Sequence, residues 1–295
     1  MEKSRQKSYL KRWLKLQLKR NYAIVIAAAA LAAVYFYALR VEPALLRVTE
    51  LEFSSPDVPP ELDSLRIAFT ADMHITRHTA ARVPEIVRTI NQLQCDLILL
   101  GGDFINGNGN GPDMAQLMPQ MQKLHAPQGV YAIAGNHEYR RGMEKFRTAL
   151  KNSHLKLLVD ETAVITLPNG GKFTLIGLDY SENPHRRSDQ KRLKDLLSTD
   201  TFNMVLSHTP EDFPFLPENA HLVFSGHTHG GQLYLPGIGS VINPPGYGRK
   251  FSYGKVCENN KTVFITAGIG SAYTQARLFM KPEIMVITLK SLPKK

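Results

Sequence analysis

The chain of 295 residues is 43% hydrophobic and 21% charged, which excludes a disordered or low-complexity protein and leaves room for one large domain or two small ones. Its net charge of +10 lies mostly in the first twenty residues, where eight Lys or Arg accompany one acid, Glu2. The rest of the chain is close to neutral, which argues against a nucleic-acid-binding domain.

Residues 1–20 are predicted to be a basic cytoplasmic tail, and residues 21–40 a transmembrane anchor. Residues 22–39 carry no charge, and as a helix they would span about 27 Å, close to the ~30 Å hydrocarbon core of a bilayer. A cleaved signal peptide is the alternative, but this apolar run is long for one and no clear cleavage site precedes Arg40. The basic flank predicts a single-pass cell-membrane protein with a cytoplasmic N-terminus and an extracytoplasmic folded domain.

Residues 41–64 are expected to form a linker, because four prolines interrupt them. Residues 65–290 are expected to form one α/β domain with a central pair of sheets flanked by helices. Short apolar runs indicate buried strands at residues 66–71, 96–102, 129–135, 172–178, 202–207, 221–226, 262–268 and 283–289. Helical patterns lie at residues 80–93, 114–124, 142–150 and 189–197.

Five polar clusters follow predicted strands at their carboxyl ends. They are Asp72-Met73-His74, Gly102-Asp103, Gly135-Asn136-His137-Glu138, Ser207-His208 and Gly226-His227-Thr228-His229. In an open α/β sheet, ligands bind in the crevice at this edge. Asp72 and His74 lie two residues apart, so in extended backbone their side chains would point to the same side. The flanking glycines suit tight turns and close backbone approach.

These clusters offer potential metal ligands. Imidazole, carboxylate and carboxamide without thiolate suit Mn, Fe, Zn, Ni or Co. The candidate ligands are too many for one ion and about right for two. Two ions about 3.5–4 Å apart can clamp a phosphoryl group and generate a hydroxide nucleophile at neutral pH. One carboxylate must bridge such a pair, and Asp103 is the candidate. A lone histidine is more often a hydrogen-bonded core residue, but five of the ten histidines fall in these clusters.

This series of motifs closely resembles the calcineurin-like metallophosphoesterase superfamily. The run Gly226 to Gln232, the anchor and the late Pro282-Glu283-Ile284 strand resemble its bacterial membrane-associated phosphodiesterase branch, which is related to UDP-2,3-diacylglucosamine pyrophosphatase-type enzymes. The resemblance covers about residues 65–290 and implies a four-layer fold of two packed mixed β-sheets flanked by helices.

The resemblance also implies roles for single residues. One metal ion would be held by Asp72, His74, Asp103 and His229, and the other by Asp103, Asn136, His208 and His227. His137 would not bind metal but would contact the scissile phosphate and protonate the leaving oxygen. Glu138 stands where the pattern more often has Asp, at a position that is not a ligand.

The leading hypothesis is therefore a dinuclear metal-dependent phosphodiesterase or pyrophosphatase that acts on an envelope or lipid-linked phosphate through a metal-bridging hydroxide. Its expected partners are a phosphorylated small molecule or lipid-linked substrate and the membrane, with no nucleic acid. One alternative is a UDP-2,3-diacylglucosamine pyrophosphatase of lipid A biosynthesis. Another is a non-catalytic envelope protein that holds phosphate in its metal site, which the complete ligand set together with His137 disfavours.

Apolar residues of the late loops are either acyl-chain contacts or ordinary packing: Leu233, Tyr234, Leu235, Phe279 and Met280.

Overall fold

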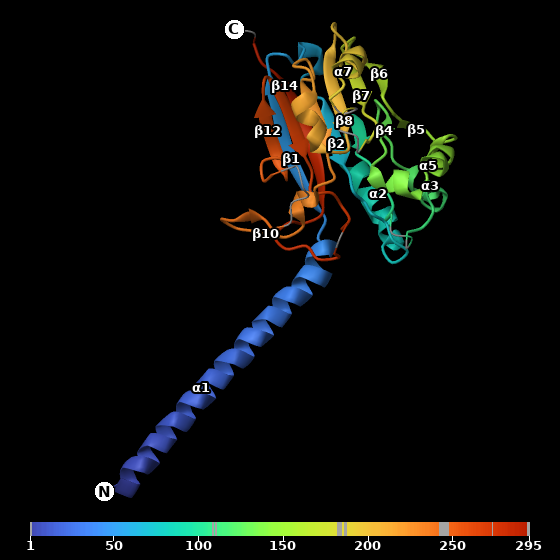
Figure 1. Cartoon of the computed structure of the whole chain (residues 1–295). Helices are drawn as coiled ribbons and strands as arrows, with labels where there is room; N and C mark the ends of the chain where they lie inside the picture. Colours follow the sequence, from blue (N-terminus) through green and yellow to red (C-terminus); the bar gives the residue numbers. More distant parts are fainter. Residues whose placement is uncertain are drawn as a thin grey trace.

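The computed structural model describes residues 2–107, 109, 111–181, 185, 188–241, 248–272 and 274–293, with side chains from residue 5 onward. A long helix, α1 (Glu2–Phe36), projects from a layered α/β domain (Figure 1). It continues through a π-helical turn (Tyr37–Val41) and a 3₁₀ turn (Glu42–Ala44). By length and composition this helix can cross a membrane, and almost none of its apolar window is buried. The basic tail and the apolar run thus form one continuous helix.

Two six-stranded mixed sheets make up the domain. The first has the order β1 (Arg47–Ser55), β14 (Glu283–Ser291), β2 (Arg66–Thr70), β3 (Leu97–Leu100), β4 (Val130–Ala132), β5 (Leu155–Leu157). The second has the order β12 (Gly254–Glu258), β13 (Lys261–Ile265), β9 (Leu222–Ser225), β8 (Phe202–Ser207), β7 (Lys172–Gly177), β6 (Glu161–Thr166). A separate hairpin pairs β10 (Tyr234–Leu235) with β11 (Gly239–Ser240). Every strand predicted from an apolar run is present.

Helices cover the outer faces of both sheets. They are α2 (Val83–Gln92), α3 (Met114–Met121), α4 (Asn136–Arg141), α5 (Met143–Leu150) and α7 (Gln190–Leu196), with 3₁₀ turns at Pro60–Leu62, Ala80–Arg82, Pro210–Phe215 and His229–Gly231. The sequence of β3 is apolar throughout because both faces of the strand are buried. Leu97 and Leu99 face the second sheet, whereas Ile98 and Leu100 pack against the helices. A further cluster joins α7 to the second sheet. This four-layer arrangement confirms the predicted fold class.

Residues 41–64, expected to be a linker, instead contain strand β1. It pairs in parallel with β14 over its whole length, from Arg47 beside Glu283 to Ser55 beside Ser291. Arg47 Nη2 donates to Glu283 Oε1 at 2.6 Å, although the two residues lie 236 positions apart. The prolines lie outside this strand, and its partner comes from the other end of the chain, so local sequence alone does not reveal it.

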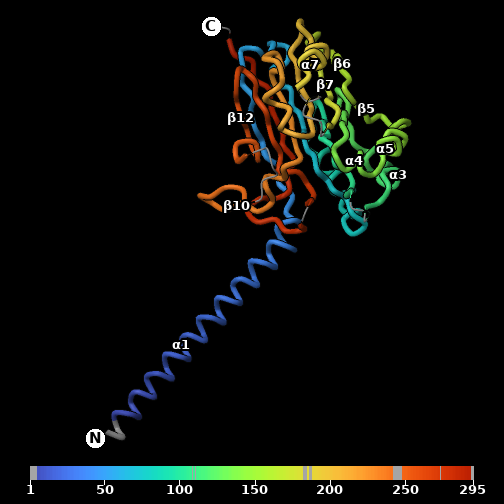
Figure 2. The backbone as a smooth tube through the Cα atoms, in the orientation of Figure 1, coloured from blue at the N-terminus to red at the C-terminus, as the bar shows by residue number. Residues whose placement is uncertain are grey.

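The strand directions place the polar clusters beside the helix that projects from the domain. Only Leu45 and Leu46 separate the end of that helix from β1, and β1 begins where β14 begins. Because β2 is antiparallel to β14, its carboxyl end returns to this edge, where Thr70 Oγ1 donates to Glu283 O at 3.0 Å. Strands β3 and β4 run parallel to β2. The chain ends at the opposite side of the domain (Figure 2).

Candidate metal centre

The side chains singled out in the sequence converge at this edge, and Asp103 lies among them. Its Oδ2 atom is 3.5 Å from Nε2 of His74, 3.5 Å from Nε2 of His208 and 3.9 Å from Nε2 of His137. Asp103 follows β3 of the first sheet and His208 follows β8 of the second, so the cluster spans both sheets. All the predicted ligands are buried except His227, which is partly exposed.

The ligand atoms fall into two groups on either side of Asp103. In the first, His74 Nε2 lies 3.0 Å from His229 Nε2, which lies 3.9 Å from Asp72 Oδ1. In the second, His208 Nε2 lies 3.0 Å from His227 Nδ1 and 3.2 Å from the side-chain oxygen of Asn136. Within each group, the His and Asp ligand atoms all lie within 4.8 Å of one another. Asp103 is a member of the second group. It also forms a third group of the same kind with His74 and His137. The arrangement can hold two metal ions.

Unpaired polar atoms show that this donor set fits cations. In the part of the chain that the structure describes, Asp72 Oδ1 is buried and has no hydrogen-bond partner. Buried carboxylate oxygens are nearly always paired, and this one faces the imidazoles of His74 and His229. A divalent ion would satisfy the carboxylate oxygen and the two facing ring nitrogens together.

Burial sets the protonation of the cluster. It is the main cause that lowers the pKa of His74 and of His227 to about 3, which keeps both imidazoles neutral. Burial would lower the pKa of His208 too, but the Asp103 and Asp72 carboxylates and a hydrogen bond to the Gly101 carbonyl together outweigh it and raise the pKa of His208 to about 10. Burial also raises the pKa of Asp72 to about 7. Neutral imidazole is the form that binds metal, so a cation at His208 displaces its proton.

The backbone of the candidate ligands adopts an uncommon conformation. Left-handed φ angles occur at Asp72 (53°), His74 (40°), Asp103 (54°), His227 (69°) and His229 (52°). Such a conformation costs a non-glycine residue about 1 kcal/mol or more, and it clusters at functional sites. The expectation of extended backbone at Asp72 and His74 is therefore wrong: tight turns, not strand pleating, bring these side chains together.

Two glycines are required by close approach to the carboxylates. A Cβ atom on Gly135 would lie 2.2 Å from Asp103 Oδ1, and one on Gly226 would lie 2.6 Å from Asp72 Oδ2. Gly102 has a φ of +90° and stands against the backbone of Gly135. These positions agree with the expected role of the flanking glycines in tight turns and close backbone approach.

Glu138 and Gly107 orient the neighbouring residues. The buried Glu138 carboxylate accepts hydrogen bonds from the backbone N–H groups of Asp103, Phe104 and Gly135 at 2.8–2.9 Å. It thereby joins the loop after β3 to the start of α4, where it caps the backbone N–H of Gly135. Gly107 N donates to His137 Nδ1 at 2.6 Å. The neutral His137 ring therefore carries its proton on Nε2, the atom nearer Asp103.

The end of α1 is bonded to a loop that supports the cluster, which the sequence did not reveal. Arg277 is completely buried, and its backbone N–H donates to Ala38 O at 2.8 Å. Its guanidinium donates to the carbonyl oxygen of Gly270. The N–H of Gly270 in turn donates to Asp72 O. The buried Glu42 carboxylate accepts from the backbone N–H groups of Phe279 and Met280 at 2.9 and 2.6 Å.

Met280 in turn packs against the loop that carries the candidate ligand His229. Its sulfur lies 2.5 Å from the position that a Cβ on Gly230 would take, next to His229. Met280 is itself buried, so ordinary packing explains this residue among the late-loop candidates for acyl-chain contact. No local motif marks Arg277 or Glu42, because their partners lie far away in the sequence.

Tyr180 is a further residue at the site that sequence reasoning missed. It follows β7, whose carboxyl end lies beside that of β8. Its ring centroid lies 5.7 Å from that of His208 and 6.4 Å from that of His227. The signal available was the Asp179-Tyr180 pair directly after a predicted strand.

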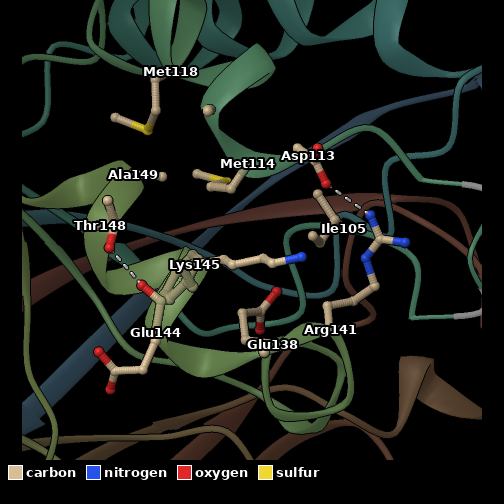
Figure 3. Close-up of a pocket in the computed structure, with 13 residues that line it drawn as sticks. Ile105, Asp113, Met114, Met118, Glu138, Arg141, Glu144, Lys145, Thr148 and Ala149 are labelled. Carbon is tan, nitrogen blue, oxygen red and sulfur yellow. Dashed lines mark hydrogen bonds and ion pairs between the residues drawn. The ribbon is translucent and has the colours of Figure 1, made fainter.

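A separate cavity of about 590 Å³ lies between α3 and α5 (Figure 3). Met114, Met118 and Phe146 form its apolar wall, and Arg141 Nη2 contacts Asp113 Oδ1 at 3.3 Å at its polar end. Among the described residues that line it, Glu138 adjoins the metal cluster, but its carboxylate is engaged by backbone N–H groups. The candidate ligands lie outside this cavity.

Paired mixed sheets that deliver Asp, His and Asn side chains from successive strand ends to one buried cluster define the class of dimetal phosphoesterases. A sequence profile described as calcineurin-like phosphoesterase matches residues 65–231. The chain belongs to that family and is a metallophosphoesterase, which confirms the predicted superfamily and enzyme class.

Several relatives share the similarity over three quarters of the chain or more. An uncharacterized metallophosphoesterase of Bacillus subtilis, YkuE, is 30% identical over 96% of this chain and 99% of its own length. A UDP-2,3-diacylglucosamine pyrophosphatase of Chlamydia muridarum, LpxG, is 24% identical over 89% of this chain and 94% of its own length. The phosphodiesterase YaeI of Escherichia coli is 27% identical over 76% of this chain and 82% of its own length.

Proposed function

We propose that the chain is a dinuclear phosphodiesterase or pyrophosphatase that hydrolyses a phosphate linked to a lipid or another envelope molecule. In this proposal Asp72, His74, Asp103 and His229 hold one ion, and Asp103, Asn136, His208 and His227 hold the other. The observation that carries the assignment is the position of Asp103, whose Oδ2 lies 3.5 Å from a ligand nitrogen of each group. Two bound divalent ions would supply Lewis-acid activation of the phosphoryl group and of the attacking water.

The chain's own residues supply orientation and a proton. The bond from Gly107 to His137 Nδ1 leaves a proton on Nε2, where it can pass to the leaving oxygen as the P–O bond breaks. Glu138 holds the loops of Asp103 and His137 in register through three backbone bonds. His227, the partly exposed candidate ligand, and Tyr180 beside it stand at the open side of the cluster.

A lipid-borne substrate is supported by the position of the cluster. The carboxyl edge of the sheets is the edge from which α1 leaves, so a membrane anchor at residues 21–40 would keep the site close to the bilayer and concentrate substrates confined to that surface. We propose a cytoplasmic N-terminus and an extracytoplasmic domain, from the basic residues before the apolar run.

UDP-2,3-diacylglucosamine is the second candidate substrate, and the relation to LpxG favours it. The proposed topology argues against it, because a nucleotide-linked precursor is expected on the cytoplasmic side. Fusions of a reporter to the C-terminus address this point: activity of a reporter that works only in the cytoplasm would overturn the proposed orientation.

The substrate is tested by a comparison within the full chain. Purified protein in detergent–lipid micelles with Mn²⁺ is assayed on a lipid-linked diphosphate, on UDP-2,3-diacylglucosamine and on a soluble aryl diester. We expect the highest kcat/KM on the lipid-linked diphosphate. Preference for the soluble diester would refute the lipid hypothesis and leave a general phosphodiesterase.

A further inference from the structure

Large hydrophobic side chains gather on the surface at one end of the domain. Among the described residues after the helix, the most exposed of this kind are Val164 (65%), Phe279 (60%), Ile238 (55%) and Val241 (52%). Val164 stands alone on the edge strand β6. The other three, which we call the apolar rim, come from adjoining segments.

Backbone contacts tie the segments of the apolar rim together. The β10–β11 hairpin carries Ile238 in its turn and Val241 just after it. Leu233, which precedes the hairpin, bridges to Leu278 and accepts a hydrogen bond from Val241 N at 2.8 Å. Phe279 follows Leu278 directly, so all three exposed side chains belong to one structural unit.

This unit lies at the end of the domain from which α1 leaves. Phe279 N donates to the carboxylate of Glu42 at 2.9 Å. The uncharged run ends at Leu39, and Glu42 follows three residues later. That separation is less than one helical turn, whose pitch is ~5.4 Å. Figure 1 shows the β10 hairpin leaving the domain close to the upper end of α1. A bilayer around the apolar run would therefore reach the level of the apolar rim.

The conformation of Phe279 is costly for a folded domain alone. Its φ is +56°, a left-handed value that is sterically unfavourable for an aromatic residue. Bonds from two consecutive backbone N–H groups to Glu42 hold this turn in place. The ring gains little in return within the chain, because it is mostly exposed. An exposed Phe of this kind suits contact with a membrane interface, where Phe, Trp and Leu form the buried apolar face of peripheral anchors.

Exposed cations belong to the same segments as the apolar rim or to segments next to them. Arg40 lies at the end of the apolar run and Lys281 two residues after Phe279. Arg249 packs beside the hairpin, with Cδ 3.9 Å from the position of a Cβ on Gly239. Exposed apolar residues flanked by Lys and Arg are the pattern that inserts into the headgroup region of anionic bilayers.

We propose that Ile238, Val241 and Phe279 insert into the interface of a bilayer that contains anionic lipid, and that this contact holds the open edge of the metal centre against the membrane surface. The proposal rests on the proposed role of α1 as an anchor. It deepens the proposed function by giving the domain a fixed orientation, in which a lipid headgroup phosphate reaches the cluster while its acyl chains stay in the bilayer.

The test uses single tryptophans in the full chain. Trp13, the one native tryptophan, is replaced by Phe, and Trp is introduced as Ile238→Trp, Phe279→Trp, Val164→Trp or Leu31→Trp. Each protein is placed in vesicles of phosphatidylcholine and phosphatidylglycerol with lipids that carry a spin label near the headgroup or deep in the acyl chain. Leu31→Trp reports the anchor, and Val164→Trp is the matched exposed control.

We expect the shallow label to quench Ile238→Trp and Phe279→Trp at least about twofold more than Val164→Trp, with blue-shifted emission. The deep label should quench Leu31→Trp. Quenching of the two rim positions no greater than that of Val164→Trp overturns the proposal, and so does an unquenched Leu31→Trp. Because the readout needs no turnover, loss of the rim and loss of the proposed hydrolytic function remain distinguishable.

Discussion

Glu42, in the 3₁₀ turn that follows α1, bonds to the loop that supports the candidate metal centre, so Glu42→Gln should weaken both folding and metal binding. The carboxylate is 1% exposed and accepts two backbone N–H groups, from Phe279 and Met280. Gln keeps one accepting oxygen but turns an NH₂ group toward the other N–H. One buried donor is then left unpaired beside the left-handed turn at Phe279.

The expected size follows from these contacts. A hydrogen bond to a charged group contributes about 1.5–3 kcal/mol, and an unpaired buried donor costs about 1–3 kcal/mol. Glu42→Gln should therefore destabilise the domain by about 2–3 kcal/mol. For a domain of this size that corresponds to a Tm lower by about 4–12 °C. Metal affinity should fall as well, because Met280 packs against Gly230 next to His229.

Calorimetry of the full chain in detergent micelles with a chelator measures the folding term without the contribution of bound metal. Titration with Mn²⁺ then measures the affinity. Glu50→Gln is the control, because this side chain is 57% exposed and its ion pair with Arg66, at 3.4 Å, lies at the surface. If Glu42→Gln matches Glu50→Gln in both measurements, the link between the anchor and the metal centre is wrong.

Three further substitutions address the cluster itself. Asp103→Asn should remove most activity and lower bound metal from about two ions toward one or none, because an amide is a poor bridge; two retained ions with normal turnover would refute the bridging role. His137→Gln should keep its metal yet lose roughly 10²–10⁴-fold in rate, less on nitrophenyl esters, whose leaving group needs no proton; an equal loss on all esters would indicate phosphate binding instead. Gly135→Ala places a Cβ 2.2 Å from Asp103 Oδ1 and should therefore lower metal content, measured by elemental analysis; unchanged content would show that the turn can shift freely.

The sequence predicts those parts of the fold that local patterns encode. Strand β3 is buried on both faces, so its run of leucine and isoleucine is apolar throughout and easily recognised. The prolines around β1 predict a linker, whereas its pairing partner, β14, lies at the other end of the chain. Parallel pairing over such a distance leaves no trace in a short window of sequence.

In the candidate site, too, the sequence predicts some features and not others. The residue types and order of the clusters around Asp72 and Asp103 indicate a metal centre, because few chemistries need that donor set. The left-handed backbone at Asp72 cannot be predicted from local sequence, because it arises from a turn held by neighbouring strands. Arg277 and Glu42 are also hidden, because a single charged residue reveals its burial only when its distant partners are in place.

The central claim is that two metal ions at this cluster hydrolyse phosphate esters, and a reconstitution measures it most directly. The full chain is stripped with a chelator and titrated with Mn²⁺ while bound metal and hydrolysis of a nitrophenyl phosphodiester are followed together. We predict no hydrolysis in the stripped protein and activity that rises to a plateau at about two ions per chain. Full hydrolysis by the stripped protein, or a plateau of bound metal without hydrolysis of any phosphate ester, would contradict the account.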